Sequence, residues 1–176
     1  AKKPQGIGFA ALDSQAQIPA LQKAADAGIP IVAFDSGVEG DLPLTTCTTD
    51  NVAAAGAAAD KMAEAIGGEG EVAAQIHDQT SATGIGRRDG FVNRMKEKYP
   101  KITLVDIKYA NDALKSADDI KATLQAFPNL KGIFAIDGSN AQGAAAALQA
   151  KGLVGKIALV GYDAYPDNVK LVKSGV

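Results

Sequence analysis

Four aspartates, each closing a short apolar run, are the residues of this chain whose type and spacing most clearly predict chemistry. The runs read IPIVAFD, EVAAQIHD, GIFAID and IALVGYD, and they end at Asp35, Asp78, Asp137 and Asp163. A carboxylate accepts hydrogen bonds from hydroxyl groups, and these bonds are stronger than those to a neutral acceptor. A cleft lined by these side chains would suit a ligand with many hydroxyl donors.

The elements that must position these aspartates are parallel strands. Each run is rich in Val, Ile, Ala and Gly, and helix-like stretches separate the runs, which is typical of strands buried on both faces of a sheet. The carboxyl ends of such strands share one edge of the sheet, where open α/β sheets bind ligands. We therefore predict an α/β fold with right-handed crossovers and the four aspartates at that edge.

The stretches between the runs predict the helices. Apolar residues at spacings of three and four indicate a helix within 16–28, which Gly28 ends. Asp50 precedes an Ala-rich helix and is expected to be its N-cap. Further helices are expected near 82–98, near 117–127, near 141–150 and from Asp167 onward.

The composition changes at one place, between about residues 37 and 50, where glycines and threonines replace the alternation of strands and helices. We interpret this stretch as a crossing between two lobes. Residues 1–45 form a partial N-terminal lobe, strand–helix–strand, leading to a hinge, and this is too little to bury both faces of a sheet. Residues 46–176 form a C-terminal lobe of ordinary domain size.

The bulk composition excludes several classes of function. With 47% hydrophobic and 22% charged residues, the chain is typical of a globular protein. A net charge of -2 without basic blocks argues against nucleic acid or an anionic membrane as a partner. The start, AKKPQ, shows no signal-peptide pattern, and the single Cys47, expected to be partly buried, can form no internal disulfide.

No pattern in the sequence predicts an enzyme. Gly6 and Gly8 in GIGFAAL lack the third glycine of a dinucleotide fingerprint, and they open a strand instead of following one. P-loop, nucleophile-elbow and Cys–His patterns are absent, and no aspartates show the DxD spacing suited to Mg²⁺. His77 lacks Cys or His partners and should alternate away from Asp78. We expect a binding protein without a cofactor.

Five phrases carry a resemblance to a known family: AGIPIVAFDSG, TTDNVAAAGAAAD, HDQTSATGIGRRDGF, GIFAIDGSNAQGAAAAL and VGYDAYPD. In this order they resemble the sugar-binding proteins of bacterial ABC importers, which include the ribose-, galactose- and autoinducer-2-binding proteins. The resemblance implies a two-lobed type I periplasmic-binding fold, with parallel sheets flanked by helices and ligand held between the lobes. Relative to that family, the chain begins near the third strand of the first lobe, which is incomplete, and lacks the last segments.

The resemblance also implies candidate ligand-binding residues. Asp35 matches an aspartate that accepts hydrogen bonds from sugar hydroxyls, although an Asx turn would equally explain it. Ser36 replaces an arginine of the ribose-binding type, which disfavours ribose and is similar to the autoinducer-2-binding type. Arg87 matches the family's cleft arginine, whereas its neighbour Arg88 points about 100° away around the helix and is expected in solvent.

Five further positions complete the candidate site. Asp137 and Asp163 match cleft residues of the family, although both could instead serve as capping or turn residues. Asn111 stands where the ribose-binding type has an aromatic ring, so an amide would replace stacking by hydrogen bonding. Gln79 resembles one of a ligand-contacting pair in the autoinducer-2-binding type. Tyr162 would lie against a sugar ring, against the hinge or in the core.

The resemblance implies a periplasmic or lipid-anchored protein that delivers a sugar or polyol to the membrane subunits of an ABC permease. A chemoreceptor is a further compatible partner, and nucleic acid is not expected. The alternative is the effector-binding core of a lactose-repressor-type regulator, which would carry a helix-turn-helix that this chain does not show. On the importer reading, Arg87→Ala or Asp163→Ala should weaken sugar binding more than about tenfold and leave the apo melting temperature nearly unchanged.

Overall fold

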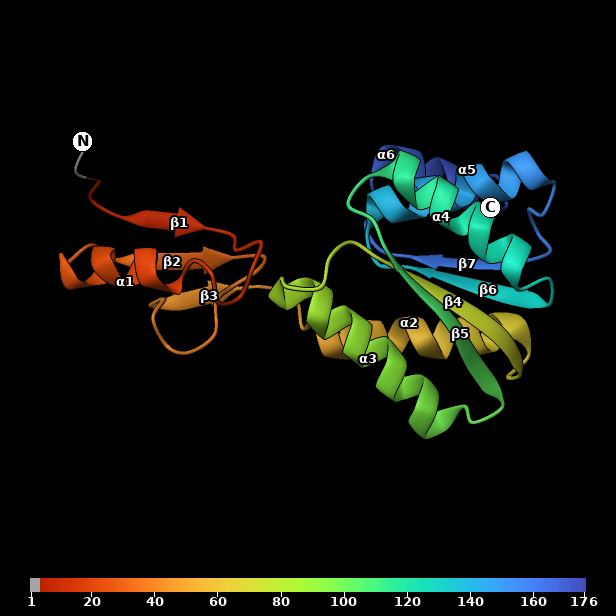
Figure 1. Cartoon of the computed structure of the whole chain (residues 1–176), viewed down its shortest axis with the longest axis horizontal. Coiled ribbons are helices and arrows are strands. Elements are labelled where there is room, and N and C mark those ends of the chain that lie inside the picture. Colours follow the sequence, from red (N-terminus) through yellow and green to blue (C-terminus); the bar gives the residue numbers. More distant parts are fainter. Residues whose placement is uncertain (1–3) are drawn as a thin grey trace.

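Residues 4–176, described by a computed structural model, form two lobes joined by a chain crossing (Figure 1). The first lobe, red to orange in Figure 1, holds β1 (Ile7–Phe9), α1 (Ile18–Asp26), β2 (Ile31–Phe34) and β3 (Thr45–Cys47). The second lobe holds α2 (Asn51–Ile66), β4 (Gly70–Ile76), α3 (Ala82–Lys98), β5 (Ile102–Tyr109), α4 (Ala113–Ala126), β6 (Leu130–Ala135), α5 (Gly138–Lys151), β7 (Ala158–Gly161) and α6 (Pro166–Lys173).

The first lobe is a small parallel sheet with strand order β1-β2-β3, packed against α1. Alternation along β2 turns Ile31 and Ala33 inward, while Val32 and Phe34 are 39% and 53% exposed. One helix therefore covers one face of this sheet, and Val32 and Phe34 lie on the other face.

The chain leaves the first sheet after β3. The segment that we expected to be the hinge crossing first pairs with β2 through Thr45–Cys47, and residues 48–50 then lead to α2. The expected lobe boundary between residues 45 and 46 falls inside this strand. Cys47, which we expected to be partly buried, is exposed because β3 is the outer strand of its sheet. The other two residues of β3 are exposed as well.

The second lobe is a parallel sheet with strand order β5-β4-β6-β7 and helices on both faces. Helices α2 and α3 lie on one face, and α4, α5 and α6 lie on the other (Figure 1). The second lobe has two buried apolar clusters. In one of them, Phe91 of α3 stacks on Phe134 of β6 with ring centroids 4.2 Å apart. The α/β architecture predicted from the sequence is confirmed.

Aspartate side chains set the starts of three helices in this lobe. Asp50 accepts a hydrogen bond from the backbone N–H of Ala53 at 3.1 Å, so its expected role as N-cap of α2 is confirmed. Asp112 caps α4 and Asp137 caps α5, and both helices therefore begin several residues earlier than the apolar spacing alone predicted. Helix α3 has the predicted bounds.

Glycines on α3 let the first turn of α2 approach it closely. A methyl group at Gly86 would lie 3.2 Å from Cβ of Asn51, and one at Gly90 would overlap the backbone of Val52. Because backbone atoms cannot rotate away as a side chain can, only glycine permits this contact. The start of α2, directly after the crossing between the lobes, is thus held against the middle of α3.

None of the helices within residues 4–176 is both long and apolar enough to cross a membrane.

Candidate functional site

A pocket of about 400 Å³ is lined by residues of both lobes, and the four strand-tip aspartates all contribute to it. Because β2, β4, β6 and β7 end toward this pocket, the convergence that the sequence predicted for these carboxylates is confirmed. The lining residues are Ala10, Ala11, Leu12, Asp35, Ser36, His77, Asp78, Ser81, Thr83, Arg87, Asp137, Asp163 and Tyr165.

Two of these aspartates, one from each lobe, have an uncommon backbone conformation. Asp35 has φ 59° and Asp163 has φ 66°, and no other non-glycine residue within 4–176 has a positive φ. The Asp163 carboxylate accepts a hydrogen bond from the backbone N–H of Gly138 at 2.8 Å, while the Asp35 carbonyl accepts one from the Thr48 hydroxyl. Left-handed conformations cost about 1 kcal/mol for non-glycine residues, and they are concentrated at functional sites.

The other two aspartates flank His77. Nε2 of His77 lies 3.4 Å from Oδ2 of Asp78, and Nδ1 lies 3.7 Å from Oδ2 of Asp137. The expectation that this side chain would point away from Asp78 was wrong. Strand β4 ends at Ile76, so the alternation of side chains that holds along a strand does not apply to the two following residues.

Asp78 and Asp137 both line the pocket and both accept backbone hydrogen bonds, Asp78 in the turn before α3 and Asp137 as the N-cap of α5. Oδ1 of Asp78 accepts hydrogen bonds from the backbone N–H groups of Thr80 and Ser81 at 3.0 and 2.8 Å. Oδ1 of Asp137 accepts one from the N–H of Asn140 at 2.8 Å. In each carboxylate, Oδ1 thus accepts from backbone N–H groups, while the other oxygen, Oδ2, lies on the side of His77.

Arg87 is the cationic member of the pocket, and it is only 8% exposed. Its Nε donates to Oδ1 of Asn51 at 2.8 Å, and its Nη1 donates to the carbonyl oxygen of Ile136 at 2.9 Å. A guanidinium has five N–H donors, so three are left without a partner among residues 4–176. By contrast, Arg88 pairs with Asp89 at 2.7 Å and does not line the pocket, as the sequence predicted.

Tyr162 supports Arg87 and does not line the pocket itself. The guanidinium carbon lies 4.4 Å from the centre of the Tyr162 ring, which is the geometry of a cation–π contact. The ring also meets Phe134 edge-on, with centroids 6.0 Å apart. Burial raises the pKa of the Tyr162 hydroxyl above its ordinary value, and the nearby Arg87 charge opposes part of that rise.

The structure does not bring Asn111 and Gln79 into this pocket. Both side chains are exposed, and neither belongs to the lining residues. Asn111 follows β5, which is the outer strand of its sheet, so its tip is separated from the β6 tip by β4. Gln79 lies in the turn between β4 and α3, where the side chain of its neighbour Asp78 takes the inner position.

Ser36 contributes to a set of hydrogen bonds between the lobes, which we call the clasp (Thr80–Ala82 with its first-lobe partners). The buried Ser36 hydroxyl accepts from the backbone N–H of Ala82 at 3.1 Å. The Thr80 hydroxyl donates to the carbonyl oxygen of Leu12 at 2.9 Å, and the Thr80 carbonyl accepts from the N–H of Ser14 at 2.9 Å. The turn that carries Asp78 is therefore held against the first lobe.

Several lining residues were not among our sequence candidates. Asp78 is not one of them, since it was predicted to line the cleft together with the other three strand-end aspartates. Leu12 and its neighbours follow β1, and their place depends on how the lobes meet. Tyr165 precedes α6 and lies so close to Gly138 that a methyl group there would overlap its ring. No local pattern marked this tyrosine.

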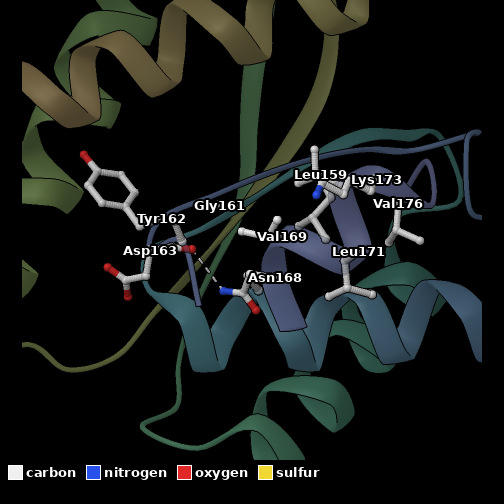
Figure 2. Close-up of a pocket in the computed structure, with 12 residues that line it drawn as sticks. Leu159, Gly161, Tyr162, Asp163, Asn168, Val169, Leu171, Lys173 and Val176 are labelled. Carbon is white, nitrogen blue, oxygen red and sulfur yellow. Dashed lines mark hydrogen bonds between the residues drawn. The ribbon is translucent and has the colours of Figure 1, made fainter. Parts of the chain in front are cut away.

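A second hollow, of about 320 Å³, lies beside α6 and β7 (Figure 2). Its lining is mainly apolar, with Leu159, Val169 and Leu171 among the contributing side chains. Figure 2 shows the side chains of Tyr162 and Asp163 pointing away from this apolar cluster. Since four carboxylates and a guanidinium converge on the interlobe pocket, whereas this hollow is mainly apolar, the interlobe pocket is the candidate functional site.

The donor set of the interlobe pocket suits an organic ligand. Within residues 4–176, no group of three or more His, Cys, Asp or Glu side chains is arranged to hold a metal ion. Carboxylates and a guanidinium together offer both acceptors and donors, which is what a hydroxyl group requires because it donates one hydrogen bond and accepts others.

Comparisons with known proteins match the whole length of the chain. The family model described as periplasmic binding protein domain matches residues 1–176. The D-allose-binding periplasmic protein of Escherichia coli K12 is 32% identical over 183 residues, which cover 99% of this chain and 58% of that protein. An ABC transporter solute-binding protein from Agrobacterium vitis, solved with α-D-tagatopyranose, has a TM-score of 0.94 and 33% identity.

A third similar protein, an ABC transporter periplasmic solute-binding protein from Actinobacillus succinogenes 130z with bound D-allose, has a TM-score of 0.87 and 34% identity. The two structural matches cover 98% and 97% of this chain but only 61% and 63% of the other chains. The chain thus spans less than two thirds of the length of each of these three relatives.

Proposed function

Because the chain belongs to the family described as periplasmic binding protein domain, we propose that it captures a sugar or polyol between its two lobes and delivers it to the membrane subunits of an ABC importer. The fold is the type I periplasmic-binding fold, since the described lobes match sugar-bound solute-binding proteins over nearly the whole chain. The sugars named with those relatives are the first candidates for the ligand.

The observation that carries this proposal is the arrangement of charge in the interlobe pocket. Asp35 enters from the first lobe, Asp163 and Arg87 enter from the second, and three donors of Arg87 have no partner among the described residues. A volume of about 400 Å³ lies in the range of pockets that hold small ligands. A polyhydroxylated ligand would supply donors to the carboxylates and acceptors to the guanidinium.

The remaining parts of the proposal follow from the relatives. All three are named as binding proteins or solute-binding proteins, so we expect binding without chemical conversion. Two are named periplasmic, which supports the periplasm, or a lipid anchor outside the membrane, as the place of action. The transport context of these names favours the importer over the repressor-type core, and a chemoreceptor stays a candidate partner.

Isothermal titration calorimetry tests the proposed function with D-allose and D-tagatose, the sugars named with these relatives, and with a pentose, D-arabinose, and a polyol, xylitol. We expect at least one of these ligands to bind one to one with a dissociation constant in the micromolar range or below, because charge-assisted hydrogen bonds from several groups act together. Binding of none of the four, by a protein whose folding is confirmed by circular dichroism, would contradict the proposal.

Thr80→Val is expected to weaken sugar binding by about two- to tenfold, because one hydrogen bond of the clasp contributes about 0.5–1.5 kcal/mol to the closed arrangement. Titration of the sugar, together with energy transfer between dyes on the two lobes, would measure this effect. Thr103→Val is the matched control, since Thr103 is exposed on β5, outside the clasp. Equal affinities in both variants would show that the clasp does not assist closure.

A further inference from the structure

We propose that Asn51 is the positioning residue of the site: its side-chain amide fixes the orientation of Arg87 and ties that arginine to the crossing between the lobes. Asn51 is the first residue of α2 and does not line the pocket. It therefore acts through Arg87, and its effect on sugar binding rests on the proposed function.

The partners of Asn51 determine which way its amide group faces. Arg87 Nε is a donor, so the atom 2.8 Å from it must be the amide oxygen, Oδ1. Nδ2 then faces the carbonyl oxygen of Thr49 at 2.9 Å and the hydroxyl oxygen of Thr48 at 3.3 Å. All of these contacts are satisfied by one orientation of the amide and by no other, because a carbonyl oxygen cannot donate.

The position of Asn51 is built into the packing of two helices. Gly86 precedes Arg87 on α3, and its lack of a side chain leaves room for Cβ of Asn51. The adjacent close approach of Gly90 to Val52 likewise lets the two helices pack backbone against backbone at this point. Asn51 can therefore reach Nε of Arg87 without leaving the helix start.

The hydrogen bonds continue from Asn51 to the first lobe. The Thr48 hydroxyl, which accepts from Asn51, donates to the carbonyl oxygen of Asp35. A chain of donors thus runs from Arg87 through Asn51 and Thr48 to the backbone of Asp35, with every hydrogen pointing in the same sense. Hydrogen bonds in such a chain strengthen one another.

This series of hydrogen bonds connects Arg87 on one side of the pocket with Asp35 on the other through residues 48–51, where the lobes are joined. Rotation of one lobe against the other must change the backbone at 48–50, and the groups bonded to Asn51 lie in that segment. Asn51 consequently couples the orientation of Arg87 to the relative position of the lobes.

Two substitutions separate the positioning of Arg87 from the link to the crossing. Asn51→Ala removes both. Asn51→Asp keeps an oxygen for Nε of Arg87 but replaces the donor by a second acceptor facing the carbonyl of Thr49. An aspartate at a helix start is favoured by the helix dipole, so this variant should fold. Asn93→Ala is the control, because Asn93 lies exposed on α3.

The first measurement needs no sugar. In ¹H–¹⁵N spectra, the Nε–H signal of Arg87, assigned by its loss in Arg87→Lys, should be protected from exchange in the unmodified protein and in Asn51→Asp. It should exchange rapidly in Asn51→Ala. An equally protected signal in Asn51→Ala would overturn the positioning role, whether or not a sugar binds.

The second measurement is the affinity for the best ligand of the sugar panel. We expect Asn51→Ala to weaken binding by about tenfold, as loss of a hydrogen bond to a charged group implies, and Asn51→Asp to restore at least half of that loss on a logarithmic scale. If Asn51→Ala binds as tightly as Asn93→Ala, the proposal fails. If the unmodified protein binds none of the sugars, the proposed function fails while the Nε–H signal still decides the role of Asn51.

Discussion

Arg87→Lys is expected to weaken binding of the best sugar ligand by about a hundredfold. Lysine keeps the charge but loses the planar fork of donors that Asn51 and the Ile136 carbonyl hold in place. Each lost hydrogen bond to a charged group is worth about 1.5–3 kcal/mol, and about 1.4 kcal/mol corresponds to tenfold in affinity. Calorimetric titration of the variant against the same sugar measures the change.

Arg88→Lys is the matched control for this experiment. Arg88 is the neighbouring residue on α3, pairs with Asp89 and does not line the pocket. The affinity of Arg88→Lys for the sugar should therefore differ from that of the unmodified protein by less than about twofold. Similar losses in both variants would contradict a specific role for Arg87. Lysine is preferable to alanine, because a cavity beside Tyr162 would itself disturb the pocket.

The structure also changes one expectation for Arg87→Ala. The sequence suggested an apo melting temperature close to that of the unmodified protein, as for a solvent-facing cleft residue. Instead, Arg87 is buried and satisfies Asn51 and the Ile136 carbonyl. Its truncation would leave both of these acceptors unpaired, so we now expect a lower melting temperature together with the loss of binding.

The sequence suggested a nearly unchanged apo melting temperature for Asp163→Ala as well, but the structure changes this expectation: the variant should abolish measurable sugar binding and lower stability. Asp163→Asn should lose at least about tenfold in affinity at nearly unchanged stability. Alanine is strained at φ 66° and offers no acceptor to the N–H of Gly138. Asparagine tolerates this φ and keeps an oxygen for Gly138, but it removes the negative charge from the pocket. Titration with the sugar and urea unfolding measure the two effects.

Asp118→Asn is the control, because Asp118 is exposed on α4 and, among residues 4–176, pairs with Lys121 alone. The pair of Asp163 variants separates binding from folding: a large stability loss in Asp163→Asn would mean that the carboxylate is structural. Unchanged affinity in Asp163→Asn would show that its charge does not contact the ligand.

The strand tips of the site could be predicted from the sequence because their signal is local. Apolar runs of a few residues ending in aspartate identify both the strand and the edge of the sheet that it reaches. Arg87 was a candidate because it matches the cleft arginine of the resembling family, and helix geometry added only that its neighbour Arg88 points elsewhere.

The residues that the sequence did not yield depend on contacts between distant segments. Asn51 reaches Arg87 only because glycines let α2 and α3 touch, and no pattern near Asn51 carries that information. Leu12 and Thr80 meet because the lobes face each other. Asn111 matched a ligand-binding position of the family in the sequence, but this match did not reveal that β5 is the outer strand of its sheet.

The matching left-handed backbones at Asp35 and Asp163 have a consequence for which molecules the protein accepts. The two residues project carboxylates into the pocket from opposite lobes. A ligand with hydroxyls along one edge alone would therefore leave the carboxylate of the other lobe without a hydrogen-bond donor. On the proposed function, removal of a single hydroxyl from either edge of the sugar should therefore weaken binding. The protein would distinguish between ligands because both carboxylates need a donor at the same time.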